Sequence, residues 1–236
     1  MKFIVLLDNG HGSNTAGKRS PKLSDGRQLL EYKWCRDTVA VLAKKLERLG
    51  IEYKIITPEL SDTPLSTRVS RANKYAADAK KEGKTAVFIS VHVNALGMGD
   101  KWMTAQGWST WTTKGVTKSD AFAQCLCDEA KSYLVSKGLK MREDKSDGDS
   151  DYEANYYVLT NTNCPATLSE NFFMDNESDC KFLLTPESNE ICAEIHARGI
   201  VKYIKSLGLW EEPSLVQTTV LKPVTNIVDF IKCKLV

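Results

Sequence analysis

Two uninterrupted apolar runs constrain the fold of this 236-residue chain more than any other feature. They cover Lys2–Leu7 and Thr85–Val93, the second of which reads TAVFISVHV. Strands that are covered on both faces have continuous apolar runs of this kind, whereas half-buried strands alternate. Helical patterns at Leu30–Leu49 and Pro64–Gly83 alternate with these runs and with a further predicted strand at Ile51–Thr57. The alternation predicts an α/β fold, with a mostly parallel (mixed) sheet and helices on both faces in a single three-layer domain.

The second half of the chain continues this pattern of strands and helices. The expected elements are a half-buried strand at Gly107–Thr113, a helix at Thr117–Lys137, an acidic loop at Glu143–Asp151, short strands at Tyr156–Thr160 and Ala166–Ser169, and a long helix at Glu187–Leu207. After Gly208 the character changes, because Pro213 follows two glutamates and suggests a hinge. Apolar residues in Pro223–Val236 share one helical face. We therefore expect a domain over residues 1–208 and an extension over 209–236 that packs on the domain, mediates self-association or acts as a linker.

Charge and hydropathy exclude two classes of function. The 32 Lys+Arg against 30 Asp+Glu leave a net charge of +2 with no long basic run, so nucleic-acid binding is not expected. No stretch approaches the roughly 18 apolar residues that a membrane span needs. Asp8 follows the first apolar run at once, without a small-residue cleavage site, so we see no signal peptide and expect synthesis in the cytoplasm.

The seven cysteines are an odd number, and a chain of this length needs no disulfide to stabilise its core. We interpret them mostly as reduced thiols. Cys125 and Cys127 lie two positions apart in a predicted helix, so they point away from each other and are not expected to bind a metal.

The three histidines occupy different settings. His196 lies within the last helix, where a surface or core-edge position is expected. His11 directly follows the first strand between Gly10 and Gly12, and His92 lies at the end of the TAVFISVHV strand. Because ligands of open α/β sheets collect outside the carboxyl ends of the strands, His11 and His92 are expected at the same edge of the sheet.

Two acidic residues could complete a site with these histidines. A catalytic zinc site needs a third ligand, and Glu31 opens the first helix directly after the loop that carries His11. Glu31 could equally be an ordinary glutamate that stabilises the helix dipole. Glu170 follows the strand Ala166–Ser169 among apolar neighbours, where a carboxylate is costly to bury without a partner or a chemical role.

Together these residues resemble those of the zinc-dependent N-acetylmuramoyl-L-alanine amidases of the type 3 amidase family, which cleave peptidoglycan. The matching motifs run in the family's order through residues 1–208, namely LLDNGHG at 6–12, TRVSRAN at 67–73, FISVHVNA at 88–95, GWSTW at 107–111 and YVLTNTNCPATLSENFFMDN at 157–176. The resemblance implies that residues 1–208 form a zinc amidase catalytic domain. It also implies that His11, Glu31 and His92 bind one Zn²⁺ per chain and that Glu170 is the catalytic acid/base.

The implied reaction is hydrolysis of the amide bond between N-acetylmuramic acid and L-alanine of the stem peptide. A zinc ion lowers the pKa of a bound water from about 16 to about 7. Glu170 would take up the proton and return it to the departing amine. Asn94 could contact the substrate near this rim or serve as a structural cap. Trp102, Trp108 and Trp111 could stack on sugar or peptide, although packing is the more common role of such residues.

The chain departs from the family pattern at a few positions. Asn9 stands where the family commonly has proline, and the loop before the first helix is longer than usual. Ser169 and Asn171 flank Glu170, in place of an apolar and a small residue. These departures bear on substrate preference rather than on the metal site.

Two other functions match part of this pattern. A non-catalytic peptidoglycan-binding module of the same fold would lack a ligand or the strand-end acid, and all four residues are present. A zinc carboxypeptidase usually has a His and a Glu within one short motif, which is absent around His11 and His92. The expected partner is therefore peptidoglycan, and the expected protein is an endolysin-like, bacteriolytic enzyme. It would be made in the cytoplasm and released at lysis, or secreted with a signal that has since been removed.

Overall fold

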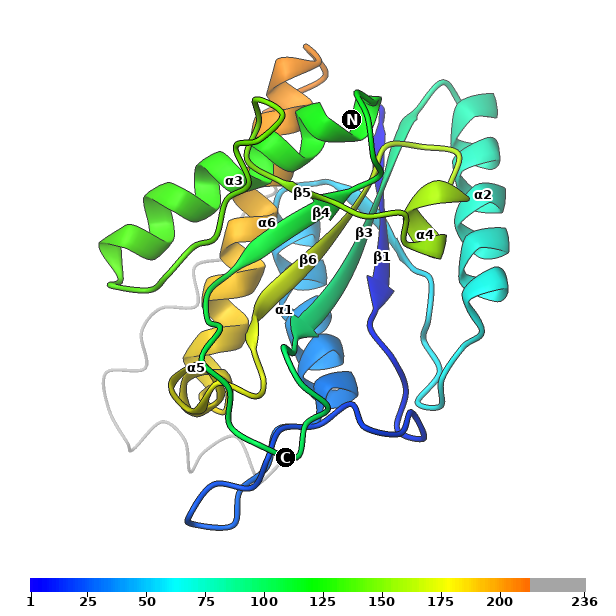
Figure 1. Cartoon of the computed structure of the whole chain (residues 1–236). Coiled ribbons are helices and arrows are strands. Elements are labelled where there is room, and N and C mark those ends of the chain that lie inside the picture. Colours follow the sequence, from blue (N-terminus) through cyan, green and yellow to red (C-terminus); the bar gives the residue numbers. More distant parts are fainter. Residues whose placement is uncertain (213–236) are drawn as a thin grey trace, which may run out of the picture.

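The computed structural model describes residues 1–212, in which a six-stranded sheet lies between two layers of helices (Figure 1). The strands are β1 (Phe3–Asn9), β2 (Glu52–Ile55), β3 (Thr85–Asn94), β4 (Ser109–Thr112), β5 (Tyr152–Glu153) and β6 (Ala166–Phe173). The helices are α1 (Glu31–Arg48), α2 (Leu65–Lys81), α3 (Lys118–Ser136), α4 (Tyr157–Thr160), α5 (Glu177–Leu183) and α6 (Pro186–Ser206).

The strand order is β2-β1-β3-β6-β4-β5. The strands β2, β1, β3 and β6 are parallel neighbours, whereas β4 runs antiparallel to β6 and pairs in parallel with β5. Because parallel strands end at the same edge, the segments that follow β1, β3 and β6 meet there. The predicted mostly parallel, mixed sheet is confirmed.

Each face of the sheet has its own apolar core. Residues of α1, α3, α5 and α6 pack on one face, and residues of α2 and α4 pack on the other, as Figure 1 shows. All seven residues of β1 are buried, and so are most residues of β3. Burial on both faces explains why these two strands have continuous rather than alternating apolar sequences.

The prediction of a strand at Tyr156–Thr160 is wrong, because this segment contains the one-turn helix α4. The adjacent residues Val158 and Leu159 are both buried, and α4 packs against α2. In a strand, adjacent side chains would point to opposite faces. A short apolar run is compatible with either a strand or a helix. Packing against α2 favours the helix in this segment.

Two short elements were not predicted from the sequence. The strand β5 has only two residues, which is too few to produce a periodic pattern. The helix α5 does carry a local signal, because the side chain of Asn176 accepts hydrogen bonds from the backbone nitrogens of Ser178 and Asp179. Asn is a favoured residue at this capping position.

The predicted face in Pro223–Val236 lies outside the described residues, as does most of the extension over 209–236. Within residues 1–212, no helix is long and apolar enough to cross a membrane. The cysteines of this part of the chain are all free thiols, as expected.

Candidate metal centre and active site

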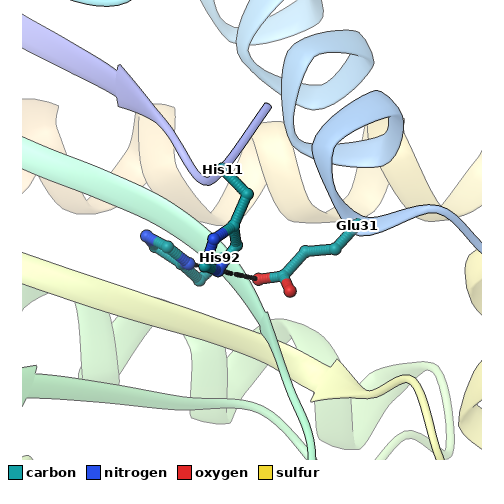
Figure 2. A group of neighbouring side chains, drawn as sticks. All are labelled: His11, Glu31 and His92. Atoms are coloured by element: carbon teal, nitrogen blue, oxygen red, sulfur yellow. Dashed lines mark hydrogen bonds and ion pairs between the residues drawn. The ribbon is translucent and has the colours of Figure 1, made fainter. Parts of the chain in front are cut away.

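The three side chains predicted as metal ligands meet at the carboxyl edge of the parallel strands (Figure 2). His11 follows β1, His92 lies near the end of β3, and Glu31 is the first residue of α1. The Oε1 atom of Glu31 lies 3.1 Å from Nδ1 of His92 and 3.4 Å from Nε2 of His11. One potential ligand atom of each residue lies within 4.8 Å of the others. The fold therefore gathers three potential ligands from separate segments.

The glycines on both sides of His11 make this arrangement possible. A Cβ atom at Gly10 would lie 2.7 Å from Nδ1 of His92. A Cβ atom at Gly12 would lie 1.9 Å from the backbone nitrogen of Asp62. Both contacts are shorter than side-chain atoms tolerate, so any larger residue would displace the imidazole or the neighbouring loop.

Glu31 is 1% exposed and lies in an environment that favours its charged form. Its Oε1 atom accepts a hydrogen bond of 3.1 Å from the backbone nitrogen of Val93, whereas its Oε2 atom has no hydrogen-bond partner. Burial alone would raise the pKa of Glu31, but the hydrogen bond with His92 and the electrostatic influence of the two histidines leave the pKa below its ordinary value. A buried, charged carboxylate with a free oxygen atom needs a cationic partner.

The chemistry of the donor set fits a divalent metal ion. Burial lowers the pKa of His11 to about 4, so this imidazole is neutral at pH 7 and its nitrogen lone pair can bind a metal. Two imidazoles and one carboxylate are a ligand set typical of catalytic zinc, which keeps a further position open for water or substrate. The second oxygen of Glu31, which lacks a partner, is consistent with this interpretation.

Glu170 lies beside this group of ligands. It pairs with His92 in the register of β3 and β6, and both residues line a cavity of about 580 Å³ together with His11 and Glu31. The Oε2 atom of Glu170 is buried without a hydrogen-bond partner. Burial, with a smaller contribution from the charge of Glu31, raises the pKa of Glu170 to about 8. A carboxyl group with a pKa near neutrality can both accept and return a proton.

Comparison with known families identifies the family to which the chain belongs. A family model described as N-acetylmuramoyl-L-alanine amidase (Amidase_3) matches residues 5–202. The chain belongs to this family. The amidase is 27% identical over 212 residues to the Endolysin of Bacillus phage SPP1, a match that covers 86% of this chain and 67% of that protein. It is 26% identical over 203 residues to the N-acetylmuramoyl-L-alanine amidase CwlM of Bacillus licheniformis, covering 84% and 67%. The chain thus spans about two thirds of the length of these relatives.

Solved structures agree with this assignment. The N-acetylmuramoyl-L-alanine amidase from Clostridium difficile 630 superposes with a TM-score of 0.70 at 26% identity, over 86% of this chain and 97% of that chain. The amidase AmiC2 of Nostoc punctiforme superposes with a TM-score of 0.67 at 25% identity, over 87% and 98%. The family, the fold and the activity predicted from the sequence are confirmed: the chain is a peptidoglycan amidase, a hydrolase related to cell-wall lytic enzymes.

Asn94 of the amidase lines the same cavity. Its Oδ1 atom accepts a hydrogen bond of 2.8 Å from the backbone nitrogen of Ala95, so the side chain acts as a local cap. A contact between Asn94 and the substrate stays a prediction.

The expectation that His196 lies at the surface or the core edge is wrong, because this residue is completely buried. Its Nδ1 atom lies 2.5 Å from the carbonyl oxygen of Cys192 and its Nε2 atom lies 2.8 Å from the hydroxyl oxygen of Ser169. A carbonyl can only accept, so Nδ1 carries the proton and Nε2 accepts from Ser169. The helix α6 packs against both α1 and α3, which leaves few of its positions exposed.

This histidine belongs to a buried polar network behind Glu170. The Nδ2 atom of Asn171 donates to the backbone oxygen of His92 at 2.9 Å and to Oγ of Ser169 at 3.1 Å. Its Oδ1 atom accepts from Nε1 of Trp108 at 2.8 Å. Trp108 is completely buried, which confirms the packing role expected of it. Asn171 thus links the strand of Glu170 to that of His92, and Ser169 links it to α6.

An ion pair in the lining of the cavity was not predicted from the sequence. Arg68 of α2 and Asp8 of β1 are both buried and lie 2.8 Å apart. The hydroxyl of Ser90 on β3 donates to Asp8 at 2.6 Å. These contacts tie α2 to the ends of β1 and β3, next to the histidines. The sequence signal that could have revealed this ion pair is the position of Asp8 next to the apolar residues of the first strand.

Proposed function

We propose that this amidase depends on zinc, with one Zn²⁺ held by His11, Glu31 and His92, and that Glu170 is its catalytic acid/base. The observation that carries the proposal is the convergence of these four groups in one cavity. Glu31 and Glu170 each keep a buried oxygen atom without a hydrogen-bond partner there. Such atoms are costly unless a cation or a proton compensates them.

The side chains divide the chemistry between them. Zinc, when bound, would supply a Lewis acid that polarises the scissile carbonyl and lowers the pKa of water. Glu31 would keep both imidazoles oriented through its Oε1 atom, which lies within 3.4 Å of each. Glu170 would accept a proton from the attacking water at a carboxyl oxygen and return it to the departing nitrogen of L-alanine. Its raised pKa suits a group that must hold a proton in one step and release it in the next.

We further infer that the amidase acts in the manner of a phage lysin, made in the cytoplasm and acting on the wall after release. The similarity to the Endolysin of Bacillus phage SPP1 supports this inference. Asn94 is proposed to contact the substrate from the wall of the cavity. Self-association through residues 209–236 remains a prediction.

Digestion of purified sacculi tests the proposal. The enzyme is assayed as purified, after chelation, and after zinc is added back, and the released fragments are identified by mass spectrometry. We expect about one zinc per chain, stem peptides with a free L-alanine amino group, and loss of release on chelation that zinc reverses. New carboxyl ends within the stem peptide would indicate a carboxypeptidase instead. Binding to sacculi without release would indicate a binding module, and full activity without metal would refute zinc dependence.

A further inference from the structure

The acidic loop Glu143–Asp151, which joins α3 to β5, has no part in the chemistry described above. Three aspartates alternate along it, at positions 147, 149 and 151. Gly148 lies between two of them with a φ of 110°, a conformation that favours glycine and turns the backbone within the motif. Ser109 of β4 pairs with Glu170, and β4 runs from there toward Thr112, which contacts this loop. The loop therefore lies toward the opposite end of the strands from the zinc cavity.

Two carboxyl groups of this loop lie together, that of Asp151 fully buried and that of Asp149 partly buried. Asp151 is 1% exposed, and its Oδ2 atom accepts a hydrogen bond of 2.6 Å from the hydroxyl of Thr112. Its Oδ1 atom is buried without any partner, and so is the Oδ1 atom of Asp149. The two carboxyl groups are within hydrogen-bonding reach of each other. Two acids in contact, each with a buried oxygen atom, repel each other when both are charged, unless a positive ion lies with them.

Within residues 1–212, the ammonium group closest in sequence, that of Lys145, donates to the hydroxyl of Ser150 rather than to either aspartate. Neither Asp149 nor Asp151 forms an ion pair within this part of the chain, and the nearby Lys145 pairs with Glu143 at 3.3 Å. Asp120, at the start of α3, adds a further negative charge next to Asp151. Burial and these acidic neighbours raise the pKa of Asp151 to about 7. The pair thus needs a shared proton or a bound cation.

We propose that Asp149 and Asp151 bind a divalent cation of the calcium class. Calcium prefers oxygen ligands from carboxylates, backbone carbonyls and water. Two carboxylates with unpartnered oxygens, on a loop with an open outer side, provide such ligands. The loop is anchored to its surroundings, because the backbone nitrogen of Ser150 donates to Gln124 of α3 and Thr112 of β4 holds Asp151. A cation at this place would therefore fasten β4 and the edge strand β5 to α3.

Thermal unfolding of the zinc-loaded, full-length chain with and without calcium chloride tests the proposal. Zinc is added first, so that the site of His11, Glu31 and His92 is filled. For a dissociation constant of about 0.1 mM, about 5 mM calcium should raise the Tm by about 5 °C or more. Magnesium chloride at the same concentration should produce a smaller rise, because magnesium demands a stricter geometry. No rise with calcium would overturn the proposal.

Two variants distinguish a bound cation from a shared proton as the group that compensates the pair of Asp149 and Asp151. Without calcium, Asp149→Asn and Asp151→Asn should unfold at or above the Tm of the wild type, because each replaces one of two carboxyl groups that compete for a single proton with a neutral amide. With calcium, the wild type should become the more stable protein, and the variants should lose most of the calcium-dependent rise. The control Asp37→Asn, at an exposed position of α1, should keep the full rise. A rise that is equal in all four proteins, or a wild type that stays below both variants in calcium, would contradict the proposal.

Terbium luminescence provides a readout that does not depend on stability. Tyr152 directly follows Asp151, and Trp111 stacks on Tyr152 with ring centroids 4.8 Å apart. Terbium bound at the proposed site should therefore emit when these aromatic rings are excited. Calcium should abolish the emission by competition, and Asp149→Asn should lack it. Emission that persists in Asp149→Asn would place the ion elsewhere.

Discussion

A single methyl group at Gly10 would occupy space that the imidazole of His92 needs, because the added Cβ would lie 2.7 Å from its Nδ1 atom. We expect Gly10→Ala to weaken zinc binding by about tenfold or more, as displaced metal ligands typically do, and to lose peptide release in proportion. The weakening of zinc binding is measured as the zinc content after dialysis against a metal buffer. Gly97→Ala is a matched control at the same cavity, since its Cβ would meet the flexible side chain of Met103 at 3.4 Å. Equal zinc retention in both variants would contradict the explanation of the GHG motif.

Lys18 offers a second prediction at the scale of one residue. Its side chain lines the cavity, and it forms no ion pair within residues 1–212, while its charge acts on His11, Glu31 and Glu170. Stem peptides carry carboxylates that such a cation can bind. Because a partly exposed charge pair contributes up to about 1 kcal/mol, Lys18→Met should raise the KM up to about fivefold. The change in kcat should be smaller, because Lys18 is only a minor influence on Glu170. The exposed Lys22, in the same loop, provides the control Lys22→Met, and identical KM values for both variants would exclude this role.

At the scale of elements, the strand of Glu170 depends on a helix that covers the sheet. His196 of α6 holds Ser169 through its Nε2 atom, and Ser169 and Asn171 are the neighbours of Glu170 on β6. These contacts fix β6 relative to β3, where His92 lies. Three elements therefore set the distance between the proposed proton carrier and the proposed metal ligands.

The buried His196 makes stability depend on pH in a defined direction. Burial lowers the pKa of His196 from 6.5 to about 4, so between these values the unfolded chain binds more protons than the folded one. Stability from this residue is complete above pH 6.5 and is lost as the pH falls toward 4, by at most about 3 kcal/mol. Urea unfolding at several pH values should show that His196→Gln, although less stable at pH 7, loses less stability on acidification than the wild type. Parallel pH profiles for the two proteins would refute this assignment.

At the scale of the whole molecule, the meeting of His11 and His92 was predictable because topology determines where they lie, whereas Glu31 was assigned only through the family resemblance. Continuous apolar runs identified β1 and β3 as central strands, and parallel strands bring His11 and His92 to one edge whatever the details of packing. The burial of His196 and the helical form of α4 depend on contacts between distant segments, which leave no periodic trace in the sequence. The pairing of Asp8 with Arg68 likewise becomes visible only when α2 lies against the sheet.

Glu31 is proposed to hold the metal and Glu170 to move the proton, and the same substitution at both positions separates these two roles. Zinc content and peptide release from sacculi are measured for Glu31→Gln and Glu170→Gln, two variants with the same nearly isosteric change. We expect Glu31→Gln to lose both zinc and activity. Glu170→Gln should keep about one zinc per chain and the Tm of the folded protein, while peptide release falls about a hundred- to ten-thousandfold. A Glu170→Gln variant that lost its zinc or kept its full rate, or a Glu31→Gln variant that retained both, would contradict the account.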